Sequence, residues 1–187
     1  MILDQDRPVD ELIIADGGST DGTPAIVRDV ARSAGLGAPV TVLEADHNVG
    51  LRHNMDRALR AATGDVIVLS DQDDVWRRDK LGHVAAAFAR PQVTLWASEA
   101  DLVDSDDEEL GLRLWDAVRL TSAGRDEIEV GRFNRRLLAG QTLTGATMAF
   151  RASVLAVACP CPMRSTAPTT PSSTTAGSLR SQASSDR

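Results

Sequence analysis

The chain of 187 residues has two cysteines, no tyrosine, 3% aromatic residues and a single lysine, Lys80. Because Cys159 and Cys161 are too close in sequence to cross-link a fold and too few to enclose zinc, they are predicted to be free thiols. Long apolar runs are missing as well. The longest, such as Val66–Leu69, are far shorter than the roughly 18 residues that a membrane span requires. We therefore expect no transmembrane segment.

An excess of positive charge and a secretory leader are also absent. The formal net charge of -7 argues against a nucleic-acid binder, because such proteins need stripes of lysine and arginine. The first residues, Met1–Arg7, meet acidic side chains early and lack the basic-then-apolar order of a signal peptide. We expect a cytoplasmic protein, or one held peripherally at the inner face of the membrane, that binds a polyanion only through a metal ion.

The 42% of hydrophobic residues suffices to build one globular core. Short apolar runs alternate with amphipathic helical patterns, which predicts a doubly wound α/β fold. The strands are predicted at residues 11–15, 40–43, 66–69 and 93–97, and the helices at residues 24–33, 51–62 and 78–88.

The second half of the chain is less regular. Residues 99–109 are rich in acidic side chains and are predicted to form an exposed, solvated loop. A helix is predicted at residues 125–138 and a strand at residues 145–150. From residue 158 to residue 187 the composition is dominated by serine, threonine, proline, alanine and arginine. We expect this segment to be a disordered tail and residues 1–157 to be the folded domain.

The most informative polar cluster is Asp71-Gln72-Asp73-Asp74-Val75-Trp76, which directly follows a predicted buried strand. Ligands of open α/β sheets bind beyond the carboxyl ends of the strands. Three carboxylates in four residues repel one another unless a cation or hydrogen-bond donors compensate them, and Mg²⁺ or Mn²⁺ would do so while bridging to a diphosphate. The alternative is that Asp73 or Asp74 caps the helix that begins near Arg77, which accounts for one carboxylate and not for three.

Two further polar clusters follow predicted strands. The glycine-rich loop Asp16–Thr23 would let backbone N–H groups approach a nucleotide, with Asp21 and small hydroxyls as ribose or base partners, although an ordinary turn fits it equally well. It matches neither the P-loop nor the dinucleotide-binding pattern. The other cluster contains Arg52 as the candidate phosphate ligand. Its remaining members are His47, which we expect to be a surface loop residue, Asn48, Gly50 and Asn54.

Three other features permit simple structural explanations. Gly145 and Thr147 are interpreted as a tight turn. Trp76 and Trp96 could stack on a sugar or base, but a role in the core is favoured, above all for Trp96. Catalysis by a Ser/His/Asp triad is not supported, because no histidine lies near a strand-to-helix nucleophile turn.

Taken together, residues 11–23 and 70–76 resemble glycosyltransferase family 2. Adding Asn48-Val49-Gly50, Asn54 and the segment 144–150 makes the chain similar to the rhamnosyltransferase-type members. The resemblance runs in order from Met1 to Val157. It implies a GT-A fold, with a Rossmann-like, mostly parallel sheet flanked by helices. It also implies inverting transfer of a sugar from a dTDP- or UDP-sugar to a hydroxyl of a cell-surface glycan or glycolipid, helped by Mg²⁺ or Mn²⁺.

The resemblance also implies roles for individual residues. Asp71 and Asp73 would form the Asp-x-Asp pair that holds the metal, and Gly145 and Thr147 would lie in a loop at the acceptor or the donor sugar. The acceptor hydroxyl would need a carboxylate base, to which no residue is assigned. The residues implied at the donor nucleotide are Asp16, Gly18, Ser19, Asp21, Asn48, Gly50, Arg52, Asn54 and Asp71.

Three departures from the family pattern accompany this resemblance. The chain begins within the expected first helix, Met1–Gln5, so the first strand and part of the nucleotide pocket are expected to be missing. Gly17 stands where many members carry a second aspartate that reads the base. The family's His-Asp-Trp-like segment, which would bring the catalytic carboxylate, is expected to be absent. We therefore expect weak binding of nucleoside diphosphate and little sugar transfer.

Two alternatives come from other functional classes. A sugar nucleotidyltransferase would need a basic glycine-rich loop and a catalytic lysine. Lys80 is the only lysine of the chain, and this shortage disfavours the alternative. A non-catalytic module that binds metal or nucleotide could use the carboxylates of Asp71–Asp74 together with the acidic stretch Glu99–Glu109.

Overall fold

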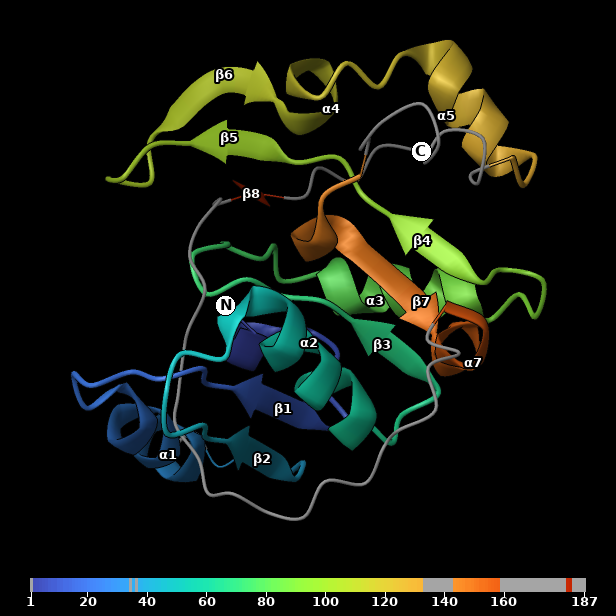
Figure 1. The fold of residues 1–187 in the computed structure, drawn as a ribbon. Coiled ribbons are helices and arrows are strands. Elements are labelled where there is room, and N and C mark those ends of the chain that lie inside the picture. The colour runs from blue at the N-terminus through green and yellow to red at the C-terminus, as the bar shows by residue number, and fades with distance from the viewer. Residues whose placement is uncertain (1, 34, 36, 133–142, 159–180, 183–187) are drawn as a thin grey trace. The chain divides into compact units, whose positions relative to one another are not determined.

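The computed structural model describes residues 2–33, 35, 37–132, 143–158 and 181–182 (Figure 1). These residues divide into two compact units. Ile2–Ile67 and the described part of Arg151–Gly177 form one, here named the N-terminal unit. Val68–Phe150 and the described part of Ser178–Arg187 form the other, here named the central unit. The chain passes from the first to the second within strand β3 (Val66–Val68) and returns within strand β7 (Met148–Arg151).

The N-terminal unit is built on two parallel strands, β1 and β2, which pair with Leu12 opposite Val40 and Ala15 opposite Leu43. Helix α2 packs on β1 and helix α1 packs on β2 (Figure 1). Because the strands are parallel, their carboxyl ends lie at the same edge. The elements are the 3₁₀ helix η1 (Ile2–Asp4), β1 (Leu12–Ala15), α1 (Thr23–Ser33), β2 (Val40–Leu43), α2 (Gly50–Ala61), the 3₁₀ helix η3 (Ala152–Val154) and α7 (Leu155–Ala158).

Two polar contacts fix the opposite end of this unit. The carboxylate of Glu11, just before β1, accepts hydrogen bonds from the backbone N of Thr63 at 2.9 Å and from its Oγ1 at 3.1 Å. The backbone N of Ala152 donates to the carbonyl of Asp65 at 2.9 Å. The first contact joins the start of β1 to the residues that follow α2, and so sets the position of the helix along the strand.

The central unit contains a sheet in which β7 lies between β3 and β4 (Leu95–Ala97). Strands β4 and β7 are antiparallel, with Leu95 opposite Phe150 and Ala97 opposite Met148. Helix α3 (Lys80–Phe88) buries Leu81, Val84 and Phe88, and so supplies much of the core of this unit.

The acidic stretch at residues 99–109 is not the solvated loop that the sequence predicts, because the structure forms a β-hairpin there. Strand β5 (Asp101–Val103) pairs antiparallel with β6 (Glu109–Arg113). The connecting turn is closed by the Asp104 side chain, whose Oδ1 accepts hydrogen bonds from the backbone N of Asp106 and of Glu108. Residues 104–109 are exposed, as predicted. The remaining elements are α4 (Leu114–Ala117), α5 (Ser122–Glu129), the 3₁₀ helix η2 (Gly145–Thr147) and β8 (Ser181–Gln182), which pairs with β5.

The α/β prediction is confirmed, and the predicted strands and helices of the N-terminal unit match within about one residue at each end. The sheets are less parallel than expected, because β4 pairs with β7, which runs in the opposite direction. The strand predicted at 145–150 begins only at Met148. Of the helix predicted at 125–138, the part beyond residue 132 lies outside the described residues, as does most of the predicted tail, including both cysteines.

Within the described parts of the chain, no helix is long and apolar enough to cross a membrane.

Helix α5 has an N-cap that can be tested. The Oγ1 of Thr121 accepts a hydrogen bond from the backbone N of Gly124 at 3.2 Å. We expect Thr121→Ala to lower the free energy of unfolding by about 1 kcal/mol, because an orphan backbone donor loses its partner. Urea denaturation of the purified chain measures this change. Thr121→Ser keeps the hydroxyl and should retain most of the stability; an equal loss in both variants would contradict the capping role.

Candidate functional site

Asp16 is the first residue after β1 and is almost completely buried, with 2% of its surface exposed. Its backbone N donates to the carbonyl of Leu43 at 2.9 Å, and its Oδ1 accepts a hydrogen bond from the Oγ of Ser19 at 2.9 Å. Within the described residues, no donor reaches its Oδ2. A buried carboxylate oxygen without a donor is costly, so this atom is suited to accept a hydrogen bond from a ligand.

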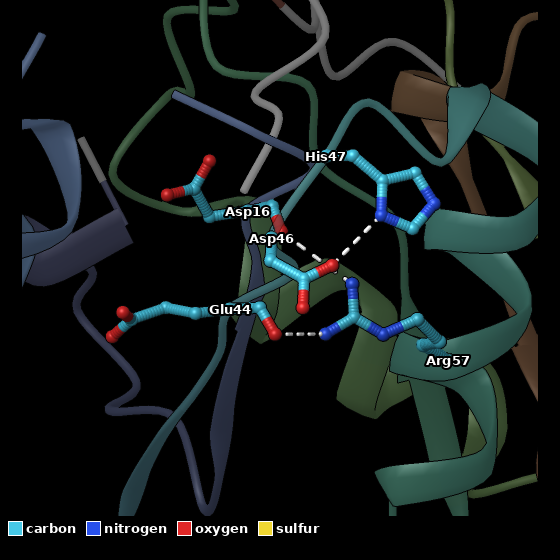
Figure 2. A network of polar contacts seen from close by, with 5 residues as sticks. All are labelled: Asp16, Glu44, Asp46, His47 and Arg57. Atoms are coloured by element: carbon cyan, nitrogen blue, oxygen red, sulfur yellow. Dashed lines mark hydrogen bonds and ion pairs between the residues drawn. The ribbon is translucent and has the colours of Figure 1, made fainter. Parts of the chain in front are cut away.

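Arg57 of α2 holds the carboxyl ends of both strands in place. Its Nη2 donates to the carbonyl of Glu44 at 2.7 Å, and its Nη1 donates, at a longer 3.5 Å, to the carbonyl of Asp16 (Figure 2). The same Nη1 donates to the Oδ1 of Asn54 at 3.1 Å. Asn54, which is 7% exposed, donates through Nδ2 to the carbonyl of Ala15 at 2.7 Å. The sequence analysis did not identify Arg57. The available signal was its position three residues after Asn54, on the same face of a helix.

Several residues predicted to contact the nucleotide shape their loops in this structure. Gly18 and Gly50 have φ angles of 124° and 74°, which favour glycine. The Oδ1 of Asn48 accepts a hydrogen bond from the backbone N of Gly50 at 2.8 Å. The Oδ1 of Asp21 accepts from the backbone N of Thr23 at 3.1 Å and from its Oγ1 at 2.6 Å, and these hydrogen bonds lower the pKa of Asp21. Both loops are therefore stiffened by their own side chains.

His47 and Arg52 lie at the surface of the N-terminal unit. The Nδ1 of His47 lies 2.8 Å from the Oδ1 of Asp46, and the imidazole is 76% exposed (Figure 2). The prediction that His47 is a surface loop residue is confirmed. Arg52 is exposed in the first turn of α2, as a phosphate ligand would have to be.

The acidic segment Asp71–Trp76 follows β3 in the central unit. Helix α3 begins at Lys80 and its N-cap residue is Asp79, so neither Asp73 nor Asp74 caps it, and the capping alternative is wrong. Among the described residues, no hydrogen-bond donor reaches the buried carboxylate oxygens of Asp73. The Asp73 carboxylate therefore has no structural hydrogen-bonding role that would account for it.

The electrostatics of this segment reflect that shortage of partners. Burial raises the pKa of Asp74 to about 6, and the negative charge of Asp71 adds to the shift. Burial also raises the pKa of Asp71, helped by the negative charge of Asp73. The positive charge of Lys80 opposes both shifts without removing them. The segment therefore favours an additional cation.

These residues fit a hard divalent ion. Mg²⁺ binds commonly through one or two carboxylates together with phosphate oxygens and waters, and the Asp71 and Asp73 carboxylates supply that set. In the described part of the chain, no three His, Cys, Asp or Glu side chains are already gathered around a metal position. Any ion held by Asp71 and Asp73 would consequently need oxygens from a ligand or from water to complete its coordination.

The predicted acceptor or donor-sugar loop, Gly145–Thr147, is the 3₁₀ helix η2 and lies before β7. Its Ala146 carbonyl accepts a hydrogen bond from the Nζ of Lys80 at 2.9 Å. The carbonyl of Thr147 accepts from the backbone N of Ser98 at 3.0 Å, and the hydroxyl of Thr147 donates to the carbonyl of Thr144 at 2.8 Å. Thr147 is 1% exposed, so its hydroxyl stabilises the loop in this state.

Both tryptophans of the sequence analysis lie in the central unit. Trp76 is 5% exposed and its ring lies 3.9 Å from the Nζ of Lys80, whereas Trp96 is half-buried in β4. Trp76 therefore packs in the core, whereas Trp96, for which the sequence most strongly favoured a core role, is not fully buried.

The predicted site residues are divided between the two units. The N-terminal unit holds Asp16, Gly18, Ser19, Asp21, Asn48, Gly50, Arg52 and Asn54, and the central unit holds Asp71, Asp73, Gly145 and Thr147. That residues of both sets contact one nucleotide stays a prediction.

The role of Arg57 can be tested by Arg57→Met, which keeps most of the side-chain length and removes the donors. We expect a loss of about 2 kcal/mol in the free energy of unfolding, because backbone carbonyls at the strand ends lose their partner. The matched control is Arg60→Met on the same helix. Arg60 forms a surface ion pair with Asp56 at 2.7 Å, and its loss should cost less than about 0.5 kcal/mol. Equal losses in urea denaturation would contradict the proposed role of Arg57.

The raised pKa of Asp74 predicts a pH dependence of stability. Between the unfolded value of 3.8 and the folded value of about 6, the folded chain binds more protons than the unfolded chain. The free energy of unfolding should therefore decrease as the pH rises through this window. Asp74→Asn removes this contribution. The free energy of unfolding of the variant, taken relative to that of the unmodified chain, should therefore be higher at pH 7 than at pH 4. Thermal unfolding in EDTA across this range measures the difference; parallel curves would refute the shift.

Comparisons with known proteins bear on the whole chain. The profile of glycosyl transferase family 2 matches residues 1–155. Over 80 residues the chain is 35% identical to a Bacillus subtilis protein named "Putative teichuronic acid biosynthesis glycosyltransferase TuaG". This alignment covers 43% of this chain and 31% of that protein. Over 110 residues it is 32% identical to an uncharacterized glycosyltransferase of Nostoc sp., covering 57% of this chain and 32% of that protein.

The aligned part of this chain spans about a third of the length of each of these two relatives. The family profile, in contrast, covers both described units, from η1 to the start of α7. The chain belongs to glycosyl transferase family 2.

Proposed function

We propose that this chain transfers a sugar from a nucleoside-diphosphate-sugar to a hydroxyl group of a cell-surface glycan or glycolipid, with inversion at the transferred carbon. The observation that carries the proposal is the buried carboxylate of Asp73, which follows β3 beside Asp71 and has no hydrogen-bond donor among the described residues. Membership of the family supports a nucleotide-sugar as the donor.

The donor and acceptor are proposed from weaker support. The likeness of Asn54 and of the Asp-Gln-Asp-Asp-Val-Trp segment to rhamnosyltransferase-type members supports a dTDP- or UDP-sugar as the donor. The name of the Bacillus subtilis relative refers to teichuronic acid biosynthesis, which favours an acceptor of the cell-surface glycan type. Gly17 is compatible with either pyrimidine base, because it has no side chain to discriminate between them.

The chemistry assigns separate tasks to the described residues. Asp71 and Asp73 would hold Mg²⁺ or Mn²⁺, which supplies electrostatic stabilisation of the leaving diphosphate. The orphaned Oδ2 of Asp16 would accept a hydrogen bond from an N–H or O–H group of the nucleoside. Arg52, exposed on α2, would neutralise part of the phosphate charge. The acceptor hydroxyl must lose its proton to a base, and none of these residues is assigned to that role.

Isothermal titration calorimetry with Mn²⁺ and with UDP or dTDP tests the proposal. We expect nucleotide binding that depends on Mn²⁺ and is weakened at least about tenfold by Asp73→Asn, because the isosteric amide removes the charge that holds the metal. The control is Asp79→Asn. Asp79 lies near the same segment but is 39% exposed and forms an ion pair with Arg77, so its loss should leave binding unchanged.

Two outcomes of this titration would overturn the proposal. Nucleotide binding that is indifferent to Mn²⁺ would exclude the assigned metal role of Asp73. Mn²⁺ binding that nucleotide does not enhance would instead support a non-catalytic cation-binding module.

A further inference from the structure

The single lysine of the chain is buried. Lys80 is the first residue of α3 and is 3% exposed. Removing an ammonium group from water is unfavourable unless nearby acceptors compensate it. Among the described residues, no arginine is buried to this degree. The contacts of Lys80 must therefore account for its position.

Lys80 contacts two segments that are far apart in sequence. Its Nζ donates to the carbonyl of Ala146, 66 residues further along the chain, at 2.9 Å. The same atom lies 3.9 Å from the centre of the Trp76 ring, in the geometry of a cation–π interaction. Because one buried atom makes both contacts, it links the η2 loop to the last residue of the acidic segment within the central unit.

The start of the acidic segment is linked to the same region by a backbone hydrogen bond. The backbone N of Leu69, directly after β3, donates to the carbonyl of Met148, directly after η2, at 3.1 Å. On another side, the carbonyl of Thr147 accepts a hydrogen bond from the backbone N of Ser98 at 3.0 Å. The acidic segment is thus attached to the η2 loop at both of its ends, and Lys80 supplies the attachment at the second end.

We propose that Lys80 is a positioning residue, which fixes the η2 loop against the acidic segment Asp71–Trp76 and so places this loop beside the sugar of a bound nucleoside-diphosphate-sugar. The placement at the sugar rests on the proposed function, in which Asp71 and Asp73 hold the diphosphate through a metal. The transferred sugar is bonded directly to that diphosphate, so a loop attached to the same segment lies within its reach. Lys80 acts through the backbone of Ala146, because its own side chain is buried.

Hydrogen exchange of single backbone amides tests the holding of η2 without metal or nucleotide. The reporter is the amide of Ser98, and the reference is the amide of Leu114, which donates to the carbonyl of Ala100 at 2.8 Å in the same unit. Lys80→Met keeps the side-chain length and removes the donor. We expect it to raise the exchange rate of Ser98 relative to Leu114 by about tenfold, because the loop that pairs with Ser98 loses a hydrogen bond.

Val84→Ala is the matched control. Val84 lies in the same helix and is 4% exposed, so its truncation destabilises the unit through packing and leaves the donor of Lys80 in place. The ratio of the two exchange rates should then stay within about twofold of that in the unmodified chain. Equal ratios in Lys80→Met and Val84→Ala would overturn the holding of η2 by Lys80.

Calorimetric titration in Mn²⁺ tests the placement at the sugar, with UDP against UDP-glucose and dTDP against dTDP-rhamnose. We expect Lys80→Met to weaken the binding of a nucleotide-sugar about tenfold and that of its parent nucleotide less than about threefold, because a displaced loop loses contacts with the sugar alone. Lys80→Arg keeps a donor and should bind the nucleotide-sugar more tightly than Lys80→Met does. Equal losses for nucleotide and nucleotide-sugar, or no loss for either, would overturn the placement.

An isotopic label in lysine keeps the inference falsifiable if Lys80→Met does not fold. Because Lys80 is the only lysine, the labelled chain gives a single side-chain ammonium signal in NMR spectra. Its protons should exchange slowly with water, and a nucleotide-sugar should shift the signal more than the parent nucleotide does. Rapid exchange would overturn the holding of η2, and equal shifts would overturn the placement at the sugar.

The two steps also separate this inference from the proposed function. If the unmodified chain binds no nucleotide in Mn²⁺, the proposed function and the placement at the sugar both fail. The exchange measurements still decide whether Lys80 holds the η2 loop.

Discussion

The structure depends on one constraint, which is that a carboxylate withdrawn from water must find a cation, a donor or a ligand. Asp16 meets it in part, through one hydrogen bond from Ser19, and keeps one oxygen without a donor. Asp73 meets it less completely, since no described donor reaches its carboxylate. These shortfalls occur directly after β1 and in the segment that follows β3, beyond the strand ends where α/β folds bind ligands.

The two units respond to this constraint in the same way. In each, a cationic side chain from a helix takes the backbone carbonyl oxygens near the strand ends: Arg57 of α2 binds the carbonyl of Glu44, and Lys80 of α3 binds that of Ala146. These cations fix the backbone around the site without forming full ion pairs with its carboxylates. The carboxylates are held in place and yet stay available, an arrangement that favours a preorganised site.

The sequence predicted well those features that depend on neighbours along the chain. The elements of the N-terminal unit were placed closely, because apolar runs and glycine-rich turns are local signals. The hairpin of β5 and β6 was missed because acidic side chains obscured the short apolar pairs within it. Arg57 could be singled out only by its position three residues after Asn54, because the carbonyls of Glu44 and Asp16 that it binds lie 13 and 41 residues away. The role of Lys80 could not be predicted, because its partner Ala146 lies 66 residues away. A pattern of residue types contains no record of such contacts.

The burial of Lys80 has a practical consequence for the chemistry of the whole surface. Apart from this residue, all basic side chains of the chain are arginines and histidines. Arginine stays protonated at any pH that a protein tolerates and does not react with the usual amine reagents. Esters and aldehydes that modify or cross-link proteins through lysine should therefore find no exposed lysine on the described surface. Reaction at Lys80 would report directly that the core of the central unit had opened.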